Sequence, residues 1–231
     1  MFTYNLLVIK INKIIKISLI LLLLSILTIT IFNVNASNLT FPLLGKIIYL
    51  DAGHGGVDNG ATVKNVNEKD INLQIVYKLK EPLTNAGATV YLTRKDDNDI
   101  SNPNALYRKK SDFDSRIALI NNSNADMYIS IHQNNYSNPK YYGPQVFYSN
   151  VNSKNEKLAK TIQEDLNKFT NSKRKIKITT NTYMYNKLNI PGILVECGFL
   201  SNKKDLTNLT NPKYQKELCS VITQSIIKYF S

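Results

Sequence analysis

Two histidines and one glutamate in this chain are placed where side chains could perform catalysis. The only two histidines of the sequence, His54 and His132, each come shortly after an apolar run, and a third run, 193–195, ends at Glu196. Runs of this length and β-branched content are typical of buried strands in a mostly parallel sheet. Sites in open α/β sheets form at the carboxyl ends of the strands. We therefore expect two imidazoles and a carboxylate to face one crevice, where they could hold zinc and supply a general base for a hydrolase.

The glycine-rich segment around His54 favours a ligand site over a phosphate-binding loop. Gly53, Gly55 and Gly56 flank the histidine and allow the backbone to approach a ligand closely. A phosphate loop would need a helix N-terminus directly after the glycines, and usually a Lys-Ser/Thr pair. Eleven residues separate Gly56 from Glu68, where the next helix is expected to start. The phosphate interpretation is therefore the weaker one.

For Glu68 and for Glu196, the sequence allows both a structural and a functional role. Glu68 lies in the first turn of a predicted helix with Asn67 as its N-cap, and the helix dipole alone favours an acid there. Spacing therefore leaves open whether Glu68 is a metal ligand. Glu196 follows three apolar residues directly, so its charge either emerges into a cleft or is buried at a high free-energy cost. An ion pair is the alternative role for Glu196.

Strands alternate with helices along the chain, which predicts an α/β fold. A helix is expected after Asn67, and residues 95–111 form a long polar loop without periodicity. The other predicted elements are strands at 45–50, 88–92, 127–131, 145–148 and 190–195 and helices at 114–123, 157–169 and 212–230. We expect residues 41–231 to form a single domain, with a mostly parallel (mixed) sheet flanked by helices on both faces.

The N-terminal segment predicts export from the cytoplasm. Residues 17–32 are uncharged and almost wholly apolar, and lysines precede them. The length falls between the ~20 residues of a spanning helix and the ~7–15 of a signal peptide core. Small residues at 34–36 would suit signal peptidase, so residues 1–40 are either an uncleaved anchor, which we favour, or a cleaved signal, followed by a short linker. In both cases the lysines stay inside and the domain lies outside the cytoplasm.

The net charge of +12 points to a polyanionic neighbour, such as a membrane surface or an anionic wall polymer, or to lysines scattered for solubility. Along the sequence the basic positions do not cluster with aromatic residues, so we expect no nucleic-acid partner. The two cysteines, Cys197 and Cys219, do not form a disulfide framework. We expect both to be buried thiols rather than a bridged pair.

Four motifs in order resemble those of the zinc-dependent N-acetylmuramoyl-L-alanine amidases. They read LDAGHGG, NEKDIN, SIHQN and VECGFLSN, and the similarity spans residues 46–230. The segment FPLLGKIIYLDAGHGG, the tail segment NPKYQKEL and the lack of a visible wall-binding repeat are similar to the CwlD group of sporulation and germination amidases. The resemblance implies hydrolysis of the amide between N-acetylmuramic acid and L-alanine in peptidoglycan, during formation of muramic-δ-lactam in spore cortex.

The resemblance also implies roles for individual residues. His54, Glu68 and His132 match the ligands of one Zn²⁺ ion, and Glu196 matches the catalytic glutamate. Asp51 is expected in a supporting role rather than a catalytic one. Some relatives need a lipoprotein activator, and the anchor would bring the chain to the membrane. Two alternatives stay open: an inactive module that binds muropeptides, and a zinc hydrolase of another wall amide bond.

Overall fold

The computed structural model describes residues 15–28, 41–179 and 183–231. The chain divides into two compact units, with the boundary between Phe41 and Pro42. In the first unit, residues 15–28 form a helix whose apolar side chains are exposed. Within the described residues, no helix is both long and apolar enough to cross a membrane. The rest of the predicted apolar run, the candidate cleavage residues 34–36 and the linker up to residue 40 lie outside the described residues.

The second unit is built on a six-stranded sheet with the strand order β4-β1-β5-β8-β6-β7. All neighbouring pairs are parallel except β6 and β8, which are antiparallel. This confirms the predicted mostly parallel, mixed sheet. The strands are β1 (Ile47–Ala52), β4 (Thr89–Leu92), β5 (Met127–Asn134), β6 (Gln145–Tyr148), β7 (Lys177–Ile178) and β8 (Gly192–Phe199), with a separate two-stranded hairpin of β2 (Thr62–Val63) and β3 (Val66–Asn67).

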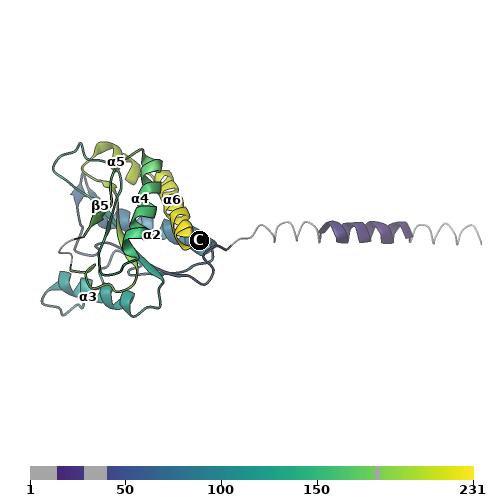
Figure 1. Ribbon diagram of the computed structural model, residues 1–231, viewed down its shortest axis with the longest axis horizontal. Helices are drawn as coiled ribbons and strands as arrows, with labels where there is room; N and C mark the ends of the chain where they lie inside the picture. The colour runs from purple at the N-terminus through teal and green to yellow at the C-terminus, as the bar shows by residue number, and fades with distance from the viewer. Residues whose placement is uncertain (1–14, 29–40, 180–182) are drawn as a thin grey trace, which may run out of the picture. The chain divides into compact units, whose positions relative to one another are not determined.

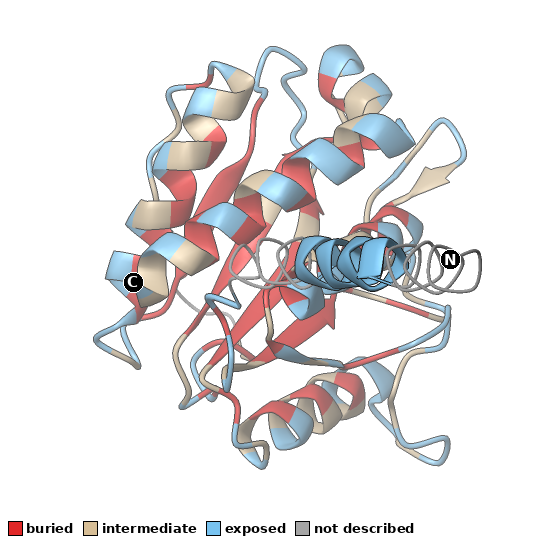
Figure 2. Cartoon of the chain, turned by 90° about the vertical axis from the view of Figure 1, so that its right-hand side faces the viewer, coloured by how far each residue is buried: buried red, intermediate tan, exposed pale blue. Residues whose placement is uncertain are grey.

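Helices cover both faces of the sheet, as predicted (Figure 1). They are α2 (Glu68–Asn85), α3 (Arg108–Asn121), α4 (Asn155–Thr170), α5 (Lys203–Leu209) and α6 (Pro212–Phe230). Helices α2, α4 and α6 pack together on one face, while α3 lies on the other. In Figure 2 the strands of the sheet are mostly buried, and the helices that pack on the sheet each turn a buried stripe toward it.

Alternation along the strands assigns each side chain to a face, because successive residues of a strand point to opposite sides. Ile48 and Leu50 of β1 belong to the larger core beneath α2, α4 and α6. Tyr49 between them packs in the smaller core with Ile120 of α3. By the same alternation, Asp51, Ser130, His132 and Glu196 belong to the α3 face, which is therefore the face that carries the polar side chains.

The structure corrects several element boundaries. Helix α3 begins at Arg108 rather than 114, so the loop predicted for 95–111 is shorter than expected. Strand β5 continues to Asn134 and β8 to Phe199, because the two strands pair beyond their apolar runs. His132 and Glu196 therefore lie within strands, directly opposite each other in the register, rather than after the strand ends. The short elements β7 and α5 were not predicted.

Both cysteines are buried free thiols, as predicted. Cys197 belongs to β8 and Cys219 to α6, and both pack in the larger core. Burial raises the pKa of the Cys219 thiol to about 12, so it stays protonated at neutral pH. Neither thiol is part of the polar site on the opposite face.

Candidate active site

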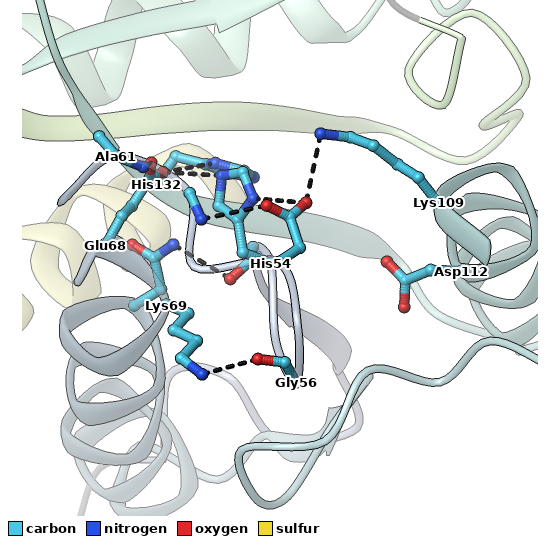
Figure 3. Close-up of polar contacts among 12 residues, drawn as sticks. His54, Gly56, Ala61, Glu68, Lys69, Lys109, Asp112 and His132 are labelled. Atoms are coloured by element: carbon cyan, nitrogen blue, oxygen red, sulfur yellow. Dashed lines mark hydrogen bonds and ion pairs between the residues drawn. The ribbon is translucent and has the colours of Figure 1, made fainter.

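Three side chains from three separate segments converge beside the ends of β1 and β5. His54 lies in the loop after β1, Glu68 is the first residue of α2, and His132 is in β5. Glu68 Oε1 lies 3.2 Å from His54 Nε2 and 2.9 Å from His132 Nδ1. The two imidazole rings meet edge to face with centroids 4.9 Å apart. Figure 3 shows these groups drawn together between α2 and the sheet.

Glu68 is far more buried than an acid that only serves the helix dipole. The residue is 4% exposed. Besides the two imidazoles, Oε1 accepts a hydrogen bond from the Gln133 backbone N–H, and Oε2 accepts one from the Ala61 N–H. Burial alone would raise the pKa of Glu68, but the hydrogen bonds from His132 and His54 outweigh it and hold the pKa well below its usual range. The carboxylate is therefore ionised and fixed between the two rings.

Two glycines make this convergence possible. A Cβ on Gly53 would lie 2.2 Å from the His132 ring, closer than any real contact. A Cβ on Gly60, which has a φ of +63°, would lie 2.6 Å from Glu68 Oε2 and 2.7 Å from His54 Cδ2. The loop therefore presents bare backbone on the side that faces the three polar side chains.

The other nitrogen of His54 is engaged by Asp58. His54 Nδ1 lies 3.0 Å from Asp58 Oδ2, which also lies 3.2 Å from Lys109 Nζ on α3 (Figure 3). Burial alone would raise the pKa of Asp58, but the hydrogen bond from His54 leads the contacts that lower it to about 2. Burial alone would lower the pKa of His54, but its hydrogen bonds and charge interactions with Glu68 and Asp58 together raise it. In a neutral imidazole, donation of Nδ1–H to a carboxylate leaves the lone pair of Nε2 available to a metal ion in place of the Glu68 contact.

The three donors fit a zinc ion by their chemistry and proximity. Within the part of the chain that the structure describes, one ligand atom from each of His54, Glu68 and His132 lies within 4.8 Å of the others. Two imidazoles and one carboxylate are a common ligand set of catalytic zinc, which keeps a fourth position for water or substrate. The Asp58 contact adds the carboxylate–histidine pair that orients such ligands.

Glu196 projects from β8 into the same cavity. A cavity of about 460 Å³ is lined by both histidines, Glu196 and apolar side chains including Phe113, Tyr183 and Leu194. Among the described residues, Glu196 Oε2 is a buried oxygen without a hydrogen-bond partner, and no ion pair of Glu196 is present. Burial and, second, the negative charge of Glu68 raise the pKa of Glu196 to about 8. The ion-pair alternative for Glu196 is therefore not supported by the described contacts.

Arg116 is a supporting residue that the sequence did not single out as functional. Its guanidinium is buried on α3 and contacts Asp51 at 2.6 Å and Asp112 at 2.7 Å. It also donates to the carbonyl oxygens of Ala52 and His54, both at 2.7 Å. Arg116 therefore fixes the backbone on both sides of Gly53. The only sequence signal was its position one helical turn before the buried Ile120, where an apolar residue would be expected.

Asp51, for which a supporting role was predicted, is held by side chains from neighbouring elements. Its carboxylate accepts hydrogen bonds from Thr93 Oγ1 at 2.8 Å and Ser130 Oγ at 2.5 Å, in addition to the Arg116 contact. Burial alone would raise its pKa, but the Arg116 charge and these hydrogen bonds lower it. A second buried arginine, Arg94, donates to the carbonyl oxygens of Ala52 and Gly53 from the opposite side. Buried carbonyl oxygens of the His54 loop are thus satisfied by two arginine side chains.

Comparisons with known proteins identify the family of the chain. The profile of the N-acetylmuramoyl-L-alanine amidase family (Amidase_3) matches residues 48–228. The germination-specific N-acetylmuramoyl-L-alanine amidase of Bacillus subtilis (strain 168) is 41% identical over 196 residues, which cover 83% of each chain. The chain therefore belongs to the N-acetylmuramoyl-L-alanine amidase family and is an amidase.

Solved structures share the fold closely. The CwlD amidase from Clostridioides difficile, determined in complex with the GerS lipoprotein, has a TM-score of 0.76 and 40% sequence identity. The match covers 80% of this chain and 98% of that one. An N-acetylmuramoyl-L-alanine amidase from Clostridium difficile 630 has a TM-score of 0.71 and 33% identity, covering 80% of this chain and 96% of its own.

Proposed function

We propose that this amidase is zinc-dependent and hydrolyses the bond between N-acetylmuramic acid and L-alanine in peptidoglycan. The observation that carries the proposal is the convergence of His54, Glu68 and His132 next to a buried, unpartnered oxygen of Glu196 in one cavity. Residues 41–231 form the catalytic domain in this proposal. The match to the amidase family supports the substrate, and the donor set supports the metal.

His54, Glu68 and His132 would hold the zinc ion, which would polarise the scissile carbonyl and make a water molecule more acidic at neutral pH. Glu196 accepts the proton of the attacking water and then donates it to the leaving nitrogen of L-alanine. Without a bound cation, burial and the charge of Glu68 raise the pKa of Glu196 to about 8. A zinc ion held by Glu68 would lower this pKa, so that Glu196 is ionised and can accept the water proton at neutral pH. Asp58 keeps the His54 ring in place through Nδ1.

The apolar part of the cavity positions the substrate and excludes water. Phe113 of α3, Leu194 of β8 and Tyr183 line the wall around the polar groups. Tyr183 is fixed by a 2.6 Å hydrogen bond to Asp114. These side chains bury the uncharged body of a muramoyl-alanine unit, while the convergent polar residues face its amide, as in most small-molecule sites.

The biological setting proposed is spore peptidoglycan outside the cytoplasm. The similarity to a germination-specific amidase supports a role in forming muramic-δ-lactam in the cortex. The complex of the similar CwlD amidase with a lipoprotein supports a lipoprotein activator for this chain as well. Residues 1–40 would attach the enzyme to the membrane or direct its secretion, as their composition predicts.

The test compares the full-length protein with Glu196→Gln, both loaded with zinc, on spore-type and vegetative peptidoglycan. We expect peptides with a free N-terminal L-alanine from the native protein, detected by mass spectrometry. Loss of the general base should lower kcat by about 10²–10⁴-fold while leaving the zinc content unchanged. Full activity of Glu196→Gln would remove this residue from the proton-transfer role.

Zinc dependence is tested separately by removing the metal with a chelator and restoring it. The activity should disappear and return with one Zn²⁺ per chain, measured by elemental analysis. His54→Ala and His132→Ala should each fail to retain the ion. A zinc-loaded native protein that binds muropeptide and never cleaves it, with or without a lipoprotein partner, would identify a binding module instead.

A further inference from the structure

A basic and aromatic pocket lies outside the cavity that contains His54, His132 and Glu196, and it has no role in the proposed reaction. It has a volume of about 400 Å³. We call it the basic–aromatic pocket, and its lining includes Lys140, Tyr141, Tyr142, Lys173, Arg174 and Lys175. Along the sequence its two halves are about thirty residues apart, which is why no basic–aromatic cluster was visible there.

Arg174 organises the pocket. Its guanidinium stacks over the Phe199 ring at 4.4 Å and the Tyr141 ring at 5.3 Å. Nε donates a 2.9 Å hydrogen bond to the Tyr142 carbonyl oxygen, which ties the two halves together. Arginine over aromatic rings keeps its charge and loses little flexibility when it binds an anion. The guanidinium is thus held in place before any ligand arrives.

The lysines and the arginine of the pocket have no close acidic partner, although the charge of the buried Asp205 acts on Arg174 without an ion pair between them. Among the described residues, Lys140, Lys173, Arg174 and Lys175 form no ion pair, whereas the cations near the active site do, for example Lys109 with Asp58. Several cations without ion-pair partners in a concave site concentrate the field and attract carboxylates or phosphates. The pocket is therefore suited to an anionic ligand.

Exposed aromatic rings form the rim of the pocket. Tyr141 and Tyr142 are 45% and 48% exposed. Tyr136 meets Tyr141 edge to face at 5.0 Å and is also about half exposed, which extends the aromatic surface. Flat apolar faces with polar tips suit a ligand that has both rings and polar groups. This combination favours a carboxylate-bearing glycopeptide over a flat lipid surface, which would need no hollow.

The pocket opens at the same end of the sheet as the active site. Gln145, which lines the pocket, is directly opposite Glu196 in the β6–β8 register. Neighbouring strands are separated by about 4.8 Å. Phe199, beneath Arg174, ends the strand that carries Glu196. A single polymer chain can therefore contact both places.

We propose that the basic–aromatic pocket binds the stem-peptide carboxylates of peptidoglycan and holds the enzyme on its polymeric substrate. This inference rests on the proposed function and adds a second contact with the same polymer. It supplies wall binding from the catalytic domain itself, through ion pairs from the lysines and Arg174 and ring contacts from the tyrosines. Teichoic acid phosphates and anionic lipids are the competing anions that the experiment distinguishes.

The experiment measures binding of the full-length protein to insoluble peptidoglycan from which teichoic acids have been removed. All proteins carry Glu196→Gln, so that the wall stays intact and binding does not depend on turnover. The pocket variant is Lys140→Gln/Lys173→Gln/Lys175→Gln, and the matched control is Lys80→Gln/Lys213→Gln/Lys216→Gln on exposed positions of α2 and α6. Single exposed substitutions of this kind change stability little, so Lys175→Gln alone serves if the triple variant fails to fold.

We expect the pocket variant to bind about tenfold more weakly, because three exposed charge contacts of modest strength are removed together. The control variant should bind as before, and amidation of the wall carboxylates should weaken binding of the unaltered pocket by a similar factor. Equal affinity of the pocket and control variants overturns the inference. So does undiminished binding to amidated wall, or a loss confined to teichoic acid or to phosphatidylglycerol vesicles.

Failure of the proposed function gives a different result. Proteins with Glu196 intact would then release no L-alanine-terminated peptide from any wall preparation, while the binding difference between pocket and control variants would persist. A chain that cleaves the wall but shows equal binding of all variants retains the amidase function and lacks the pocket contact.

Discussion

Replacing Arg116 with methionine removes the residue that supports the His54 loop from within the protein. Arg116 is 1% exposed and forms ion pairs with Asp51 at 2.6 Å and Asp112 at 2.7 Å. It also donates to the carbonyl oxygens of Ala52 and His54. Methionine has a similar length and no charge, so the substitution leaves two buried carboxylates without their cation.

The expected effect is large, because removing one partner of a buried ion pair costs about 3–5 kcal/mol. A domain of this size shifts in Tm by about 2–4 °C for each kcal/mol. The Arg116→Met protein should therefore melt about 6–20 °C below the native protein. Zinc binding should weaken as well, since the carbonyl oxygens on both sides of Gly53 lose a donor and the His54 ring is less well positioned.

The pH dependence of the folding stability shows whether the Asp51 carboxylate stabilises or destabilises the folded protein. Arg116 lowers the pKa of Asp51 in the folded protein, whereas burial alone would raise it. A lowered pKa means stability that is present above the unfolded value of about 3.9 and is lost as the pH falls below it. In Arg116→Met the folded pKa rises instead, so protonation relieves the unpaired charge. The stability difference between the two proteins should therefore shrink as the pH decreases.

Urea denaturation of metal-free protein, in the presence of a chelator, measures these effects without a contribution from bound zinc. The double-mutant cycle uses Arg116→Met, Asp51→Asn and the double variant. Because the two side chains are in contact, the double variant should be less destabilised than the sum of the single variants by about 1.5 kcal/mol or more. Additivity within about 0.5 kcal/mol, or a loss below about 1 kcal/mol for Arg116→Met, would refute the reasoning.

Three further changes test the ligand geometry. Asp58→Asn should lower the affinity for zinc by about 10–100-fold, because no carboxylate then orients the His54 ring. The measurement is competition with a zinc-binding dye, and an unchanged dissociation constant would contradict the prediction. Gly53→Ala should displace the His132 ring, since the added Cβ would lie 2.2 Å from it. The variant protein should lose zinc and activity but keep its far-UV circular dichroism spectrum. Full activity of this variant would contradict the packing argument. Removing zinc with a chelator should lower the stability of the native protein by about 2.7 kcal/mol, compared with the same protein in free zinc at one hundred times its Kd. Calorimetry should show no difference between the zinc-loaded and chelated samples of His54→Ala. A difference as large as in the native protein would mean that the ion binds elsewhere.

The positions of His54, His132 and Glu196 could be anticipated from the sequence, because each is tied to an apolar run. Such runs become buried neighbouring strands, and parallel strands bring their carboxyl ends to one edge. The structure has β1, β5 and β8 side by side, which places the three side chains at one cavity. Burial of apolar surface is encoded locally, so this part of the prediction needed no knowledge of the complete fold.

The role of Glu68 could not be decided from the local sequence. An acid in the first turn of a helix is favoured by the dipole whatever its tertiary contacts, so the sequence could not separate that role from a ligand role. Only the packing of α2 against the sheet brings its carboxylate within 3.2 Å of His54 and 2.9 Å of His132. The extension of β5 and β8 was missed for a similar reason, since pairing between them continues past their apolar residues.

The sequence by itself determined the α/β class, the order of the elements and the residue types available for catalysis, since periodicity and apolar runs are properties of short segments. Tertiary structure alone decided the buried Arg116–Asp51 pair and the basic–aromatic pocket. The partners in each are 65 and about thirty residues apart along the chain. Charges at such separations are brought together by the packing of helices and loops on the sheet, and this long-range packing has no signature in a local pattern.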